Sequence, residues 1–232
     1  MTIAEMHYDF KRKLNKVDSL KNKNLLIPEI DRVLNESYEL FVKLIAFPRN
    51  YSFRGFEVNQ RTIDDLRTLI ENPVPITVVG NVAALPAAYW HYVRGYALCS
   101  KTGCTTDQDI RVTIRKHGDI YEDNSFEKSD FAWRQLNAVF VGNEIRFDAD
   151  FTVETLNLTY LKRPEYIHYA DGFTGNTYTL PSTTVLVGTQ DCELPDHTHN
   201  EIVDLAVLLA SGELGSPNLQ VNQNKLSLNS LI

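Results

Sequence analysis

The sequence predicts an α+β fold, because its hydrophobic periodicity changes once along the chain. Up to about residue 70, apolar side chains recur every three or four residues, which is the spacing of amphipathic helices. From residue 73 the apolar runs become short and rich in β-branched residues, and several alternate with polar residues as strands do. The chain has 232 residues, of which 43% are hydrophobic, so it is long enough to bury a core.

Residues 1–72 are expected to form a helical hairpin followed by a short helix that starts at Thr62. Pro28 suits the first turn of the second helix, and Pro48 ends that helix. Both long helices carry apolar stripes, formed by Ile3, Met6, Phe10, Leu14, Val17 and Leu20 and by Ile30, Val33, Leu34, Tyr38, Phe41, Val42 and Ile45.

The combined stripe of the two helices is wider than one β domain needs to cover. We therefore expect part of it to meet another subunit. Within the second helix, Tyr38, Phe41 and Val42 are predicted to face the core of the chain itself. The residues predicted to contact a second subunit are Met6, Phe10 and Leu14.

Residues 73–190 are expected to form an antiparallel, sandwich-like β domain. No helix-length segment separates the strands, so parallel crossovers are not predicted. Gly142-Asn143 lies between two strand-like runs and predicts a hairpin. The predicted strands are residues 76–79, 89–98, 110–114, 138–140, 144–147, 156–161 and 185–187, with a loop at 171–184.

The C-terminal part is predicted to contain one helix and an extended tail. The helix, within residues 191–214, begins near Asp196 and is expected to pack on the helical region. The tail, residues 215–232, has too few apolar residues to form a core of its own. Its Leu226 and Leu228 alternate, so we expect them to add a strand to the sheet edge of a neighbouring subunit or partner.

Charge and composition exclude several classes of protein. The chain carries 23 Lys and Arg against 30 Asp and Glu, a net charge of −7, whereas a free nucleic-acid binder needs a basic surface. Three cysteines cannot complete a disulfide framework, which favours a reducing compartment. No signal peptide and no apolar run of membrane-spanning length is apparent, so we expect synthesis in a cytoplasm and no membrane contact.

The sequence predicts no catalytic site, no cofactor and no metal site. Cys192, His197 and His199 are the strongest metal candidates, but their spacing matches no common zinc pattern. Cys99 and Cys104 are expected to be small buried thiols. No nucleophile, phosphate-binding or dinucleotide motif occurs, and no acid, base and oxyanion site assemble from the sequence.

The order of five segments resembles the head-to-tail connector, or neck ring, proteins of crAss-like and related tailed phages that infect Bacteroidetes. The resemblance covers most of the chain, although each segment alone is weakly specific. In chain order, from residues 10, 31, 85, 158 and 193, the segments read FxxxLNKVDS, DRVLNESYELFV, LPAAYWHY, LTYLKRP and ELPDHTHNEIVDLAV.

The resemblance implies a virion structural protein assembled in the host bacterium. Such proteins form a ring, expected to be twelve-fold, that joins the capsid portal to adjacent neck or tail rings. DNA passes through the lumen without specific binding, and the acidic charge of this chain is compatible with that.

Three other functions remain open from the sequence. Another tail or minor head protein of the same kind of virion would share this composition. A hydrolase would use His197, His199 and Glu201, and a glycan-binding module would use the aromatic run Tyr89, Trp90 and Tyr92.

Overall fold

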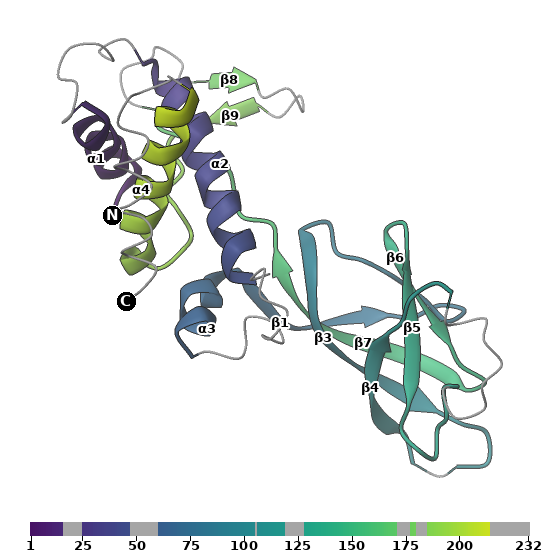
Figure 1. The fold of residues 1–232 in the computed structure, drawn as a ribbon. Coiled ribbons are helices and arrows are strands. Elements are labelled where there is room, and N and C mark those ends of the chain that lie inside the picture. Colours follow the sequence, from purple (N-terminus) through teal and green to yellow (C-terminus); the bar gives the residue numbers. More distant parts are fainter. Residues whose placement is uncertain are drawn as a thin grey trace. The chain divides into compact units, whose positions relative to one another are not determined.

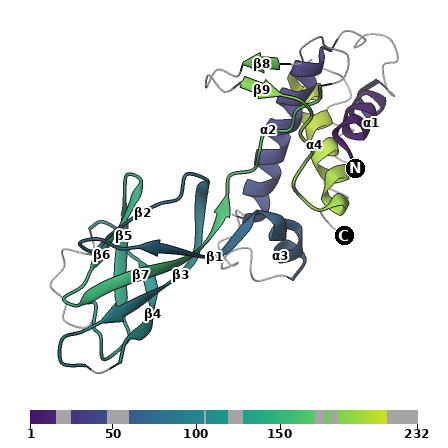
Figure 2. The same ribbon diagram turned by 180° about the vertical axis from the view of Figure 1, so that it is seen from behind.

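The computed structural model describes residues 1–15, 25–46, 60–104, 106–118, 128–170, 177–179 and 185–213. The chain divides into two compact units: one combines Met1–Thr68 with Pro164–Ile232, and the other is Leu69–Arg163. Figures 1 and 2 show the helices of the first unit and the curled sheet of the second, which confirms the α+β prediction. The unit boundaries differ from the expected 73–190 β region, since residues 164–190 belong with the helices.

The helical unit is built around α4. Helices α1 and α2 each pack more extensively against α4 than against each other, and α4 lies between them in both views (Figures 1 and 2). The expected two-helix hairpin is therefore a bundle with a third helix inserted. The bounds are α1 Ile3–Asn15, α2 Ile27–Ala46, α3 Gln60–Leu66, a 3₁₀ turn at Arg67–Leu69 and α4 Asp196–Glu213.

Polar contacts fix the ends of this bundle. The Met1 amino group lies 2.7 Å from Asp196 Oδ1 at the start of α4, and Lys13 Nζ of α1 lies 2.8 Å from Asp204 Oδ1 of α4. The amino group lowers the pKa of the Asp196 carboxyl, because the positive charge favours the ionised form. None of the helices in the described residues combines the length and hydrophobicity that a membrane span requires.

A buried polar network joins α1, α2 and the segment that follows the sheet. His7 Nε2 and Asp31 Oδ1 are 2.7 Å apart, and the other carboxylate oxygen of Asp31 accepts the backbone N–H of Tyr169 at 3.2 Å. The Asn35 side chain accepts the N–H of Ile167 and donates to its carbonyl, at 2.7 and 2.8 Å. These bonds satisfy backbone groups that no ladder pairs, and they hold residues 167–169 against α2.

The second unit is a seven-stranded curled sheet with the strand order β1-β7-β3-β4-β5-β6-β2. Its concave face encloses a core in which Ile110, Leu136, Ile145 and Leu156 are wholly buried. The strands are β1 Ile70–Thr77, β2 Val82–Ala84, β3 Tyr89–Ser100, β4 Gln108–Ile114, β5 Leu136–Val141, β6 Glu144–Asp148 and β7 Thr152–Lys162.

The expectation of a wholly antiparallel sheet is wrong at one strand pair. Strands β4 and β5 run parallel, with Val112 opposite Leu136. The connection between these strands spans residues 115–135. It is long enough to return the chain to the end of the sheet at which β4 begins, as a parallel pair requires. The Gly142-Asn143 hairpin is confirmed, since β5 and β6 pair antiparallel up to Val141 opposite Glu144.

The first strand begins earlier than the sequence predicted. Strand β1 contains Pro73 and Pro75, which the predicted strand at 76–79 excluded. It is an edge strand that pairs only with β7 in the sheet order, so prolines cost few ladder hydrogen bonds there. In the helical unit, β8 Thr177–Thr179 and β9 Val185–Val187 form a two-stranded sheet, and β8 falls in the segment predicted as a loop.

Candidate functional site

An open cleft of about 610 Å³ is the first candidate for chemistry. The lining residues that the structure describes are Gln60, Arg61, Ile63, Asp64, Asp65, Arg67 and His197. At its centre His197 Nε2 lies 2.8 Å from Asp65 Oδ1. The His197 side chain is half exposed, whereas the Asp65 side chain is buried, so the carboxylate orients an accessible imidazole.

The polar partners of this pair favour a structural role. The two cleft arginines are engaged, Arg61 with Glu201 at 3.0 Å and Arg67 with Asp64 at 2.8 Å. The described lining residues include no hydroxyl or thiol side chain that the imidazole could activate as a nucleophile. No group of three or more His, Cys, Asp or Glu side chains in the described part of the chain is arranged to hold a metal ion.

His199 and Cys192 do not join His197 in one site. His199 is 2% exposed, and its Nε2 donates to the Leu194 carbonyl at 2.8 Å, so it braces the start of α4. His197 and His199 are two residues apart on a helix and therefore point to different sides. The Cys192 thiol is largely surrounded by protein, and burial raises its pKa to about 11.

The thiols give a simple chemical prediction. Cys99 is buried as predicted, and burial raises its pKa to about 12. The prediction is wrong for Cys104, which is exposed. The nucleophile is the thiolate, so we expect Cys104 to react much faster than the other two with Ellman's reagent at pH 8. All three thiols should react after unfolding in guanidinium. Equal rates for all three in the folded chain would contradict the burial of Cys99 and Cys192.

The predicted subunit contacts on α1 are corrected by the structure. Met6, Phe10 and Leu14 are 0%, 1% and 7% exposed within the single chain. Helix α4 covers this side of α1, so the three side chains are buried within one chain, and only Phe10 also lines the pocket described below. The other two predicted contacts, Leu226 and Leu228, lie outside the described residues.

The core assignments on α2 agree with the prediction. Tyr38, Phe41 and Val42 are each at most 5% exposed. Burial raises the pKa of the Tyr38 hydroxyl, with the neighbouring Cys192 and Glu193 adding to that shift.

The aromatic run on β3 packs as core and does not form a flat platform. A bulge between Tyr89 and His91 shifts the alternation of the strand. As a result, Tyr89 and Tyr92 both contact Phe140, with ring centroids 6.0 Å apart in each case. The Tyr92 hydroxyl donates to the Val112 carbonyl at 3.0 Å. Trp90 instead stacks beside His91, so the three aromatic rings do not share one face for a sugar.

The most exposed large hydrophobic side chain in the described residues is Trp133, which is 84% exposed. It stands on a tight turn between Asp130 and Gln135, whose backbones exchange hydrogen bonds of 2.8 and 2.9 Å. The Asp130 carboxylate accepts the N–H groups of Ala132 and Trp133 at 2.7 and 3.1 Å. The turn is therefore a braced structure that holds an indole in solvent.

Two further residues support the same turn. Phe131 is buried and packs edge-on against Phe151, with ring centroids 5.6 Å apart. Arg134 has φ of +52°, a left-handed conformation that is uncommon for a residue with a side chain. Such backbone strain is retained where the surroundings determine the conformation, which here leaves Trp133 and Arg134 exposed.

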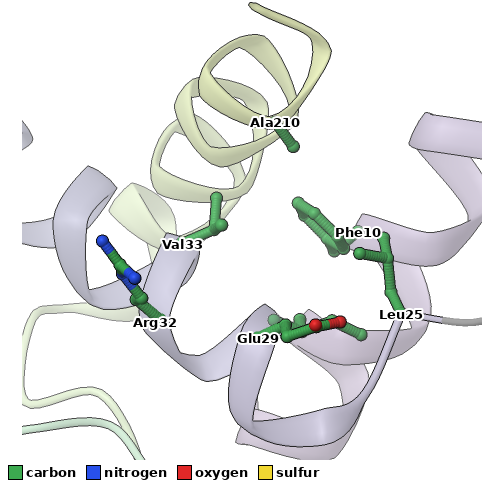
Figure 3. Close-up of a pocket in the computed structure, with 7 residues that line it drawn as sticks. Phe10, Leu25, Glu29, Arg32, Val33 and Ala210 are labelled. Carbon is green, nitrogen blue, oxygen red and sulfur yellow. The ribbon is translucent and has the colours of Figure 1, made fainter. Parts of the chain in front are cut away.

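An apolar pocket of about 280 Å³ lies at one end of the helical bundle. Phe10, Leu25, Ile30, Val33 and Ala210 supply its apolar lining, and Glu29 and Arg32 its polar residues. In Figure 3, Phe10, Val33 and Ala210 approach the same space from α1, α2 and α4. The Glu29 carboxylate also accepts the N–H of Leu26 at 2.9 Å, which caps α2 and holds Glu29 in place.

No family model matches the sequence. None of the curated proteins is significantly similar to it either.

Trp133 and the pocket were not anticipated from the sequence. A signal for the first exists, because Ser129-Asp130 is a typical turn start and Trp133 follows within the same short connection. The pocket has no local signal, since its lining comes from three helices that are distant in the chain.

Proposed function

We propose that this chain is a structural subunit of a ring in the neck of a tailed phage, between the capsid portal and the tail. The observation that carries the proposal is Trp133, an indole 84% exposed on a turn that the protein braces with four hydrogen bonds. Large apolar groups held rigidly in solvent are typical of contact surfaces, and Trp is enriched among the residues that dominate binding energy.

The type of assembly comes from the sequence. The ordered resemblance of five segments to neck ring proteins points to the portal vertex and to a ring with the portal and adjacent neck or tail proteins as partners. The net charge of −7 supports a role in which DNA passes through the lumen without being held.

The chemistry of the described residues supports a structural role over the hydrolase alternative. The accessible imidazole of His197 has a carboxylate partner, but the described lining of its cleft offers no nucleophile. His199 is buried away from solvent. A different tail or minor head protein of the same virion is the remaining alternative of the structural class.

The proposal is tested by the mass of the protein in solution, alone and with a portal protein of a crAss-like phage. Multi-angle light scattering should show a multi-copy complex with the portal, and the free chain should associate as its concentration rises. A monomer under both conditions, at concentrations well above micromolar, would overturn the ring function.

A further inference from the structure

Two features on this chain complement each other: the exposed Trp133 in one unit and the apolar pocket in the other. Resting on the proposed ring function, we propose that Trp133 of one copy inserts into the pocket formed by α1, α2 and α4 of the next copy. The partner of both features is thus a second copy of this chain.

The backbone that carries the indole is preorganised for insertion. The turn is closed by the paired backbones of Asp130 and Gln135 and by the Asp130 carboxylate, so little backbone entropy is lost when it docks. Phe131 is buried and anchors the turn to the sheet. Trp is among the residues that contribute most to the binding energy of interfaces.

The pocket has the size and chemistry for an indole. A cavity of about 150 Å³ accommodates a benzene ring, so the 280 Å³ here admits two fused rings. Its walls are aromatic and aliphatic, from Phe10, Leu25, Ile30, Val33 and Ala210. The indole N–H needs an acceptor when buried, and the Glu29 carboxylate provides one in the lining.

Charge complements shape at the same place. Arg134 follows Trp133 on the turn and is exposed, and Glu29 lies in the lining of the pocket and is also exposed. Arg134 makes no ion pair with any residue that the structure describes, so its guanidinium is available to a carboxylate of a neighbour. Docking the indole would bring these opposite charges together.

The symmetry of such a contact fits a ring. The two surfaces are different, so each copy can offer a Trp133 to one neighbour and a pocket to another, which is a heterologous contact. Heterologous contacts propagate from copy to copy and close into a ring when the rotation between copies permits it. A two-fold dimer would instead exchange both contacts between the same two copies.

Cross-linking between two different variants tests the contact. One chain carries Ala132→Cys, at an exposed position beside an intact Trp133, and the other, with a size tag, carries Val33→Cys. Both have a Cys104→Ser background that removes the exposed native thiol. The chains are mixed and treated with a short bis-maleimide, free and bound to the portal. We expect roughly tenfold more cross-linked pair from the mixture than from either variant alone, because docked thiols have a high effective concentration.

Val79→Cys is the matched control for the indole position. Val79 is 75% exposed and lies in the same unit, so it offers a similarly accessible thiol outside the Trp133 turn. Mixed with Val33→Cys it should cross-link no better than the single variants. Equal yields for positions 79 and 132, free and portal-bound, would overturn the proposal. A cross-link within one chain carrying both Ala132→Cys and Val33→Cys, with none in the mixture, would also overturn it.

Coverage of the pocket by residues of the same chain beyond 213 is a separate outcome. In that case Val33→Cys would resist maleimide in the full chain and react after truncation following Gly215, and the proposal would fail.

The failure of the ring function is distinguishable from all of these. A ring on the portal without the mixed cross-link leaves the function standing and removes only the Trp133 contact. A mixed cross-link without a portal complex would leave the Trp133 contact standing and would remove the ring function.

Discussion

Replacing Asp31 by Ala is expected to lower the free energy of unfolding by about 2–5 kcal/mol, because the change removes the acceptor of a buried hydrogen-bond network. Asp31 is fully buried and meets His7 at 2.7 Å, while its second oxygen accepts the N–H of Tyr169. The variant leaves a buried imidazole and a buried backbone N–H without their partner. Urea unfolding followed by circular dichroism measures the change.

The matched control is Asp64→Ala. Asp64 also pairs with a basic side chain, Arg67 at 2.8 Å, but both are more than half exposed. Exposed ion pairs contribute about 0–1 kcal/mol, so this variant should unfold nearly as the parent does. If the two variants lose the same stability, the network around Asp31 does not hold the helical unit together.

Met6→Ala should cost about 2–5 kcal/mol of unfolding free energy in the free subunit, because the side chain is wholly buried within the bundle. The loss should be independent of protein concentration, since α4 of the same chain covers this side of α1. Denaturation at two protein concentrations measures both properties.

Tyr8→Ala on the same helix is the control for Met6→Ala. Tyr8 is 68% exposed, so its removal should change stability by no more than about 0.5 kcal/mol. A Met6→Ala variant that unfolds like the parent but associates less would support the prediction from the sequence that Met6 contacts a second subunit. The burial of Met6 within the chain would then be wrong.

The helices were predictable because their signals are local. The stripe from Ile30 to Ile45 and the flanking prolines predicted α2 to within a few residues of Ile27–Ala46. Periodicity shows that a face is buried, but not which element covers it. That is why Met6 and Phe10 were assigned to a second subunit, although α4, nearly two hundred residues later, covers α1 in the same chain.

The sheet was predicted less completely because its pairing is not local. The β5–β6 hairpin has a two-residue turn at Gly142-Asn143, and this local signal sufficed. The parallel pairing of β4 with β5 depends on the path of a long connection, which no residue pattern specifies. The predicted start of strand β1 was several residues too late, because Pro73 and Pro75 normally end a strand. The position of β1 at the sheet edge permits both prolines.

The candidate surfaces depend on tertiary structure in the same way. His197 could be singled out from the sequence, but its partner Asp65 comes from another helix, 132 residues away. Trp133 is one of two tryptophans in the chain. Ser129-Asp130 marks the start of a turn before it, but this signal does not show whether the indole is exposed or buried. The braced turn makes that distinction, through the Asp130 carboxylate and the buried Phe131.

Electron microscopy of the protein bound to its portal tests the central proposal most directly. The ring function predicts particles in which several copies of this chain surround a channel coaxial with that of the portal. The Trp133 contact predicts in addition that Trp133→Ala, a change at an exposed side chain, reduces the fraction of portals carrying a complete ring. Portals that remain bare, or that bind isolated copies away from the channel, would contradict the proposed function.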